Sequence, residues 1–202
     1  QGIRFEQIYL QGDYMKIIIL TGSPHSNGTT ALLADEFCAG ATEAGHEILR
    51  FDTAKLRIEA CLGCDHCRII SGNCVHEDDM SQIYPHLKEA EAVVLVTPLY
   101  YFGMTAQLKR AVDRFYAINS AMRATSKKVC LISAGADEDE WAMEALVAHY
   151  RTICRYMNWE AAGEVVALGS GKRDDLAETE YLSMARSLGA EIRMDPSRYT
   201  IL

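Results

Sequence analysis

A buried strand that runs into a loop of small polar residues, and then into a helix, constrains this chain more than any other feature. Residues 16–20 are strongly apolar, and residues 21–30 read TGSPHSNGTT. A helix that starts after such a loop leaves backbone N–H groups without partners and points the positive end of its dipole at the loop. The segment therefore predicts a phosphate-binding loop at the end of a strand.

The loop supplies neutral hydrogen-bond donors rather than a lysine. No Lys follows Gly28, so it is not a Walker loop, and the G-x-G-x-x-G dinucleotide pattern is also absent. A strand-to-helix turn with an ordinary N-cap is the simpler alternative, but five donor side chains in eight residues exceed what one cap needs. We expect the anion contacts to come from Ser23, His25, Ser26, Asn27, Gly28, Thr29 and Thr30.

Length and charge narrow the class of protein. The 202 residues carry a net charge of −8, which argues against a nucleic-acid surface. No apolar run approaches the roughly 20 residues that a membrane span needs. No signal peptide is visible, so a cytoplasmic, reducing compartment is expected. We interpret residues 1–14 as a tag or leader extension and residues 15–202 as a single domain.

The hydrophobic pattern predicts strands that alternate with helices. We expect strands at 16–21, 47–52, 92–97, 129–133 and 165–168. Apolar stripes predict five helices. The first follows the loop, and the second begins at a capping box at 79–82. The other three include Leu108–Phe115, Trp141–Ile153 and Tyr181–Ile192. This alternation favours a three-layer, doubly wound α/β fold with a five-stranded parallel sheet. Because 47–52 is less apolar, it belongs at an edge, which gives the strand order 2-1-3-4-5.

Two further loops fall at the same edge of this sheet, where the strands end. The loop after residue 97 contains three consecutive aromatic residues, which offer flat apolar surface for a planar ring. The loop after strand 129–133 is made of small residues that permit close backbone approach. As an alternative, Tyr101 and Phe102 pack as core or in a subunit interface. The expected ring contacts are Pro98, Leu99, Tyr100, Tyr101, Phe102, Gly103, Ser133 and Gly135.

Four of the seven cysteines cluster in one short segment. Cys61, Cys64, Cys67 and Cys74 have the spacing C-x2-C-x2-C-x6-C. Structural disulfides are not expected in a reducing compartment, so metal or redox chemistry has to be weighed. Three cysteines at three-residue steps are typical of a ferredoxin-type 4Fe–4S cluster. Free thiols, a redox disulfide, and zinc held together with neighbouring histidines remain alternatives.

These motifs resemble one known family. The loop 21–30 and the segment 98–109 are similar to the FMN-phosphate loop and the isoalloxazine-lining loop of the flavodoxin-like, NAD(P)H-dependent FMN reductases. The cysteine spacing resembles that of their iron–sulfur flavoprotein branch. The resemblance implies a flavodoxin-like fold, FMN as cofactor, NAD(P)H as electron donor, and a homodimer or homotetramer. It departs at His25, where many relatives carry arginine.

The expected function is an FMN-dependent oxidoreductase that passes electrons from NAD(P)H to a small acceptor such as a quinone or a flavin. One alternative is an electron carrier in which a 4Fe–4S cluster beside FMN exchanges electrons with a redox protein. A second alternative is a non-catalytic FMN- or zinc-binding sensor. No side chain is assigned a catalytic role, because a flavin itself supplies the redox chemistry.

Overall fold

A single five-stranded parallel sheet organises the chain. The computed structural model describes residues 14–70, 72 and 74–193, so the expected tag or leader extension lies outside the described residues except for Tyr14. The strands pair in the order β2-β1-β3-β4-β5, all parallel. They are β1 (Lys16–Thr21), β2 (Glu47–Asp52), β3 (Ala92–Pro98), β4 (Lys128–Ala134) and β5 (Glu160–Ala167). This confirms the expected fold class and strand order.

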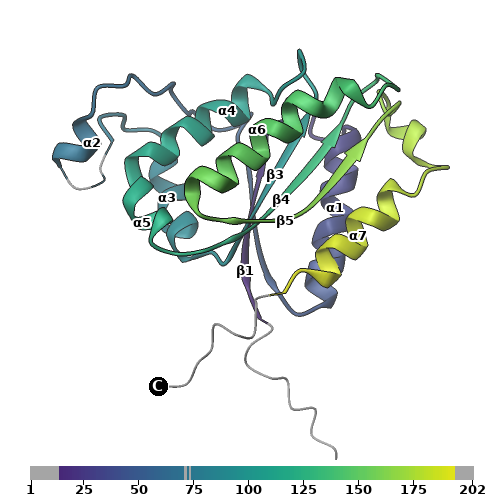
Figure 1. Cartoon of the computed structure of the whole chain (residues 1–202), viewed down its shortest axis with the longest axis horizontal. Coiled ribbons are helices and arrows are strands. Elements are labelled where there is room, and N and C mark those ends of the chain that lie inside the picture. Colours follow the sequence, from purple (N-terminus) through teal and green to yellow (C-terminus); the bar gives the residue numbers. More distant parts are fainter. Residues whose placement is uncertain (1–13, 71, 73, 194–202) are drawn as a thin grey trace, which may run out of the picture.

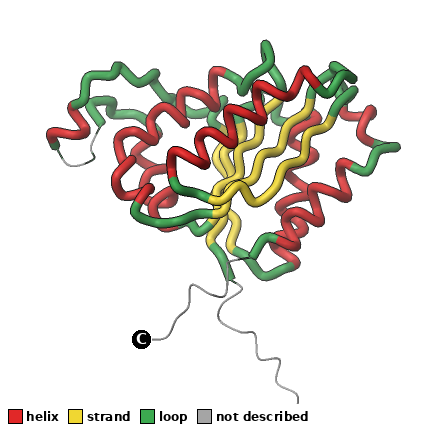
Figure 2. The backbone as a smooth tube through the Cα atoms, viewed as in Figure 1, coloured by secondary structure: helices red, strands yellow, loops and turns green. Residues whose placement is uncertain are grey.

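Helices cover both faces of the sheet (Figures 1 and 2). On one face, α1 (Thr29–Glu43) and α7 (Tyr181–Glu191) enclose a core centred on Phe37, Val94 and Ile132. On the other, α3 (Met80–Glu89), α4 (Ala106–Asp113) and α6 (Trp141–Met157) enclose a second core. The short elements are α2 (His66–Ile69), η1 (Arg114–Ile118), α5 (Asn119–Arg123) and η2 (Arg173–Leu176).

The sequence pattern placed the buried face of α6 incorrectly. The apolar stripe was expected to include Trp141, but that side chain is 54% exposed. The buried face instead includes Tyr150, whose hydroxyl donates to the carbonyl oxygens of Val129 and Gly163. Because these two acceptors lie on β4 and β5, they fix the rotation of the helix about its axis.

No helix among the described residues has the length and hydrophobicity needed to cross a bilayer.

Candidate functional site

The loop after β1 is held in place by hydrogen bonds to β3 and to the residue before α4. The backbone N–H of Gly22 donates to the carbonyl oxygen of Val96 on β3 (2.8 Å), and Thr105 Oγ1 donates to the carbonyl oxygen of Gly22 (2.8 Å). A Cβ at position 22 would lie 2.5 Å from Thr105 Oγ1, so glycine is required there by close approach. The loop is therefore anchored to β3 and to the start of α4.

The start of α1 is open to an anion. Gly28 is the N-cap, and no side chain of the described residues caps the helix. Within the loop, Ser23 Oγ accepts a hydrogen bond from the backbone N–H of His25 (3.1 Å), and the N–H of Gly28 donates to the carbonyl oxygen of His25 (3.3 Å). The first backbone N–H groups of a 15-residue helix thus face the cavity, the arrangement that suits a phosphate group.

The aromatic loop forms a tight turn. The N–H groups of Tyr100 and Gly103 each donate to the other's carbonyl oxygen, at 3.0 and 3.2 Å. Tyr101 and Phe102 between them have φ values of +50° and +63°, as a type I′ turn requires. The Tyr101 side chain is fully exposed, and Phe102 stacks on Trp141 with ring centroids 5.3 Å apart. Non-glycine residues with these φ values are strained, which is common at functional loops.

Two more loops complete the edge of the sheet. The N–H of Gly135 donates to the carbonyl oxygen of Ala167, and the N–H of Ser170 donates to that of Gly135. A Cβ at position 135 would lie 2.9 Å from Met143 Cε, so a larger residue does not fit without movement. Ser133 is fully buried, and its hydroxyl lies 3.9 Å from Met143 Sδ. These contacts join the loops after β4 and β5.

Together the four loops enclose one cavity of about 480 Å³ at the carboxyl ends of the strands, toward the top of Figure 1. Of the expected site residues, Ser26, Tyr101, Phe102, Gly103 and Ser133 do not line it. The lining residues are Ser23, His25, Asn27, Gly28, Thr29, Thr30, Pro98, Leu99, Tyr100, Ala134, Gly135, Ala136, Ser170, Gly171, Lys172 and Arg173.

The loop after β5 brings a cation that the sequence analysis did not assign to the site. Arg173 Nη1 donates to Asn27 Oδ1 at 2.6 Å. Because the Asn27 oxygen is taken, its amide NH2 group is left as a donor toward the cavity. Arg173 thus supplies positive charge beside the loop after β1. The adjacent cations Lys172 and Arg173 after the last strand were the available signal.

The four cysteines of the segment also come together. All four carry free thiols and line one small cavity, into which His76 also reaches. Burial raises the pKa of the Cys67 thiol, and the nearby Cys74, Cys61 and Cys64 raise it further. No group of three or more His, Cys, Asp or Glu among the described residues is arranged around a single metal ion. The thiols converge without forming a closed site for one ion.

Hydrogen bonds that involve side chains, rather than strand pairing, join the residues before the cysteine segment to those after it. The Arg57 N–H donates to Asp79 Oδ2 (2.7 Å), and Arg57 Nη2 donates to the carbonyl oxygen of Glu77 (2.6 Å). The Glu59 N–H donates to Asp78 Oδ2 (2.9 Å). The expected capping box at 79–82 is therefore wrong. Asp79 does not cap α3, because its carboxylate accepts from the backbone N–H of Arg57, on the other side of the cysteine segment.

A buried ion pair lies at the centre of this closure. Arg114 Nη1 and Nη2 donate to the two carboxylate oxygens of Asp78 at 2.6 and 3.1 Å, and both side chains are almost fully buried. Burial by itself raises the pKa of Asp78, but the hydrogen bonds from Arg114 and from the Glu59 N–H outweigh it and hold that pKa below its ordinary value. The pair ties η1 to the residues that follow the cysteine segment.

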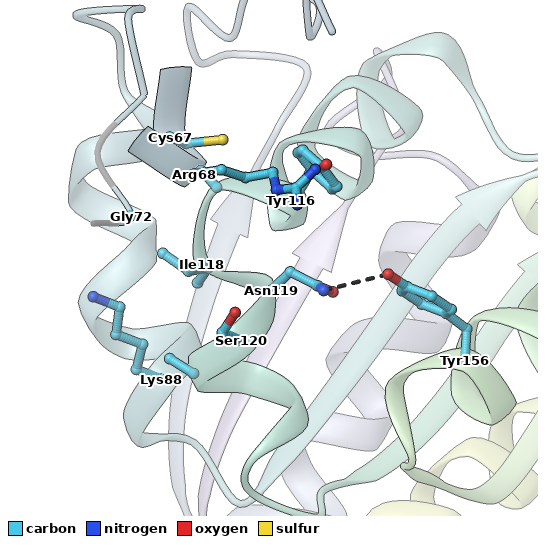
Figure 3. A pocket seen from close by; sticks show the side chains of 11 residues that line it. Cys67, Arg68, Gly72, Lys88, Tyr116, Ile118, Asn119, Ser120 and Tyr156 are labelled. Atoms are coloured by element: carbon cyan, nitrogen blue, oxygen red, sulfur yellow. Dashed lines mark hydrogen bonds between the residues drawn. The ribbon is translucent and has the colours of Figure 1, made fainter. Parts of the chain in front are cut away.

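A larger cavity, of about 630 Å³, shares Cys67 with the small cavity lined by the four cysteines (Figure 3). Arg68 and Lys88 stand at its rim, and Asn119 Nδ2 donates to the Tyr156 hydroxyl across it at 3.3 Å. Its described lining holds these two cations and no acidic side chain, which favours an anionic group. It is separate from the cavity at the carboxyl edge of the sheet.

Residues 15–173 match the family of NADPH-dependent FMN reductases. The chain belongs to this family. It is thus an NAD(P)H-dependent FMN oxidoreductase by family, as the sequence predicts. The expected likeness to iron–sulfur flavoproteins is also confirmed, since proteins of that name are prominent among its curated relatives.

The similarity to individual proteins is distant but extends over most of the chain. An iron–sulfur flavoprotein of Archaeoglobus fulgidus is 27% identical over 198 residues, 91% of this chain and 84% of its own length. Iron–sulfur flavoprotein MJ1083 of Methanocaldococcus jannaschii is 32% identical over 125 residues, 62% of this chain and 64% of its own. The NAD(P)H:quinone oxidoreductase of Methanothermobacter marburgensis shares the fold, with a TM-score of 0.67 at 19% identity, over 90% and 98% of the two chains.

Proposed function

We propose that FMN binds in the cavity at the carboxyl edge of the sheet. The observation that carries the proposal is the junction of the open α1 N-terminus with Arg173 and Asn27 beside a wall of Pro98 and Leu99. The phosphate lies against residues 23–30, where backbone N–H groups and a cation converge. The isoalloxazine ring lies against residues 98–100 and the backbone of Gly135.

Bound FMN supplies the redox chemistry, accepting a hydride from NAD(P)H and passing the electrons to a small acceptor such as a quinone or a flavin. The chain's own residues bind and orient it. Leu99 and Pro98 exclude water from one side of the ring, and the Gly135 backbone approaches its edge. No side chain of the site is assigned proton transfer, in keeping with the neutral donors of the loop.

The test of this site is FMN binding by the apoprotein, followed through quenching of flavin fluorescence. We expect saturable binding of one FMN per chain. Substitution of Leu99 by Asp, which puts a charge against the ring, should abolish it, whereas Leu62→Asp on the exposed cysteine segment should not. Binding that is absent in the wild-type protein, or unchanged in Leu99→Asp, contradicts the proposal.

The second candidate function is an electron carrier with a 4Fe–4S cluster at Cys61, Cys64, Cys67 and Cys74, beside FMN in the same domain. The convergence of the four thiols on one cavity favours it. In such a cluster each iron takes one cysteine, so the thiols stand farther apart than around a single zinc ion. The donor set therefore suits a cluster, which would exchange single electrons with FMN and with a redox-protein partner.

Iron and sulfide analysis after anaerobic reconstitution tests the cluster. We expect about four of each per chain. The Cys74→Ser variant should lower both, while Cys38→Ser, a half-buried thiol of α1 outside the segment, should not. Iron that stays near zero in the wild-type protein rejects the cluster and leaves the FMN proposal untouched.

The protein is further proposed to act as a homodimer or homotetramer in a reducing, cytoplasmic compartment. An exposed aromatic patch supports the first point: Tyr100, Tyr101, Phe102 and Trp141 are 45%, 101%, 43% and 54% exposed. The free thiols support the second. A stable monomer in light scattering with FMN bound contradicts the oligomer.

A further inference from the structure

The donors of the buried Arg114 are not all used. Nη1 donates to Asp78 Oδ2 and to the carbonyl oxygen of Glu59 (2.9 Å), and Nη2 donates to Asp78 Oδ1. The remaining Nε atom is buried and has no hydrogen-bond partner among the described residues. A buried donor left unpaired destabilises the folded chain, and a charged donor does so more strongly. Such a group calls for an acceptor that the bare chain does not provide.

The position of Arg114 identifies the kind of acceptor. Its side chain, 1% exposed, lines the same small cavity as Cys61, Cys64, Cys67 and Cys74. Of the described residues that line this cavity, Arg114 is the one that bears a permanent positive charge. The lining also holds the Asp65 carboxylate, but that group accepts from the Tyr116 hydroxyl (2.9 Å) and pairs with Arg68, so the sulfur of the four cysteines is the acceptor chemistry left for this donor.

We propose that Arg114 donates its Nε–H to an anionic sulfur atom held in the four-cysteine cavity and thereby favours the reduced form of the redox group there. The sulfur belongs to a cysteinate or to a cluster sulfide, and the identification with a cluster rests on the second function proposed above. Hydrogen bonds to the sulfur atoms are one determinant of the reduction potentials of such groups.

The charge balance gives the direction of the effect. When one electron passes from reduced FMN to the cluster, the cluster becomes more negative by one unit, and Arg114 keeps all its protons. No bond at Arg114 forms or breaks. The donor strengthens as negative charge accumulates on sulfur, so the reduced state gains more than the oxidised state. Arg114 is thus a positioning and tuning residue, not a catalytic one.

The Arg114→Lys variant separates this role from the ion pair. A lysine ammonium retains the positive charge and can still bind Asp78 and the carbonyl oxygen of Glu59, but a methylene group stands near the place of Nε–H. We expect the reconstituted variant to bind FMN as the wild type does, with its reduction equilibrium constant lowered about tenfold. For a one-electron couple that is a potential about 59 mV lower.

Arg57→Met is the matched control. Arg57 also joins the residues before the cysteine segment to those after it, but it is exposed and does not line the cavity. If Arg114 acts only by holding the segment closed, both variants shift the potential equally, which overturns the proposal. An unchanged potential in Arg114→Lys overturns it as well. A shift confined to Arg114→Lys supports it.

The result stays decisive if the wild-type protein takes up no iron. The cluster is then rejected, and the same variants are compared in thiol redox buffers, where a disulfide of the segment gains two electrons and one proton on reduction and leaves one cysteine as the thiolate that accepts from Arg114. There a tenfold change equals about 30 mV. An equal potential in Arg114→Lys and wild type overturns the proposal, and so does the absence of any disulfide.

A measurement on the wild-type chain covers a failure of Arg114→Lys to fold. In protein with 15N-labelled arginine, the Nε–H resonance of Arg114 should shift or broaden when the cavity is loaded with iron and sulfide, or when its cysteines change redox state. The Arg57 resonance is the internal reference. Equal responses of the two arginines overturn the proposal.

Discussion

The cavity at the carboxyl edge of the sheet and the four-cysteine segment are built by different means. Around the cavity, backbone hydrogen bonds join each loop to the end of a neighbouring strand, as between Gly22 and Val96, and between Leu99 and Ala134. The cysteine segment is closed mainly by side chains, chiefly the Asp78–Arg114 pair, together with one backbone hydrogen bond from the Asp79 N–H to the carbonyl oxygen of Arg57. The first site follows from sheet topology, whereas the second depends on a few side chains and on what its thiols bind.

Breaking the ion pair should have the largest effect on stability. In Asp78→Asn the buried guanidinium keeps its charge but loses its partner, so we expect the free energy of unfolding to fall by about 3–5 kcal/mol. Denaturant unfolding at neutral pH measures it. Asp79→Asn, which alters the neighbouring half-buried carboxylate, should cost less than about 1 kcal/mol. Equal losses in the two variants contradict a special role of the buried pair.

The effect of Asp78→Asn should depend on pH. The pKa of Asp78 is lower in the folded than in the unfolded chain, so its stabilising contribution is complete above the ordinary aspartate pKa of about 3.9. It is lost as pH falls through the lowered folded-state pKa. The difference between wild type and Asp78→Asn should therefore shrink at acid pH. A difference that stays constant from neutral to strongly acid pH rejects this assignment.

The steric anchor of the phosphate loop should rank second. In Gly22→Ala the new Cβ would meet Thr105 Oγ1 and Leu108 Cβ, at 2.5 and 2.6 Å before relaxation. We expect a loss of about 1–3 kcal/mol in stability together with weaker FMN binding, because the whole loop must shift. In Gly103→Ala the added Cβ meets open space, so unfolding should be nearly unchanged. Full FMN affinity in Gly22→Ala would mean that the loop position does not matter.

Removal of the cation beside the loop should weaken binding without weakening the fold. Arg173 is exposed, so Arg173→Ala should leave the unfolding free energy within about 0.5 kcal/mol. It removes the bond to Asn27 and a positive charge near the phosphate, and we expect FMN to dissociate about tenfold more readily. Calorimetric titration with FMN checks it. Arg151→Ala, which removes an exposed charge bound to Glu164, should bind FMN normally.

The smallest effect concerns the strained turn. Tyr101 has φ +50° and a fully exposed side chain, so glycine at this position relieves backbone strain and removes little packing. Tyr101→Gly should raise the stability of the monomeric chain by about 0.5–1 kcal/mol. If the aromatic patch is a subunit interface, the same variant should dissociate at higher protein concentration. A loss of stability in the monomer contradicts the strain.

The sequence predicted what repeats along the chain and missed what depends on single distant contacts. The first two strands, the strand order and the loop between β1 and α1 follow from apolar runs and polar loops that are local in sequence. The buried face of α6 did not follow, because the two hydrogen bonds of Tyr150 override the apolar stripe. β5 begins at Glu160, five residues before its apolar run, since an edge strand pairs on one side and tolerates polar residues.

The same distinction holds within the two candidate sites. The glycines, hydroxyl residues and cysteine spacing are visible in the sequence. The bond between Arg173 and Asn27 spans 146 residues, and the pair of Asp78 with Arg114 spans 36. A charged residue in a loop or helix shows that a cation or anion is present, but not which distant side chain it contacts. These contacts come from the return of the chain to the same edge of the sheet and to the base of the cysteine segment.

Anaerobic reduction of the FMN-loaded protein by NADPH, followed by stopped-flow absorbance, tests the central claim most directly. We expect NADPH, NADH or both to bleach the flavin band of the bound FMN completely, and a quinone or free flavin then to restore it. Dithionite serves as the control that the bound flavin is reducible. If dithionite bleaches the band while both nucleotides leave it unchanged at millimolar concentration, the chain is not an NAD(P)H-dependent FMN oxidoreductase and the account is wrong.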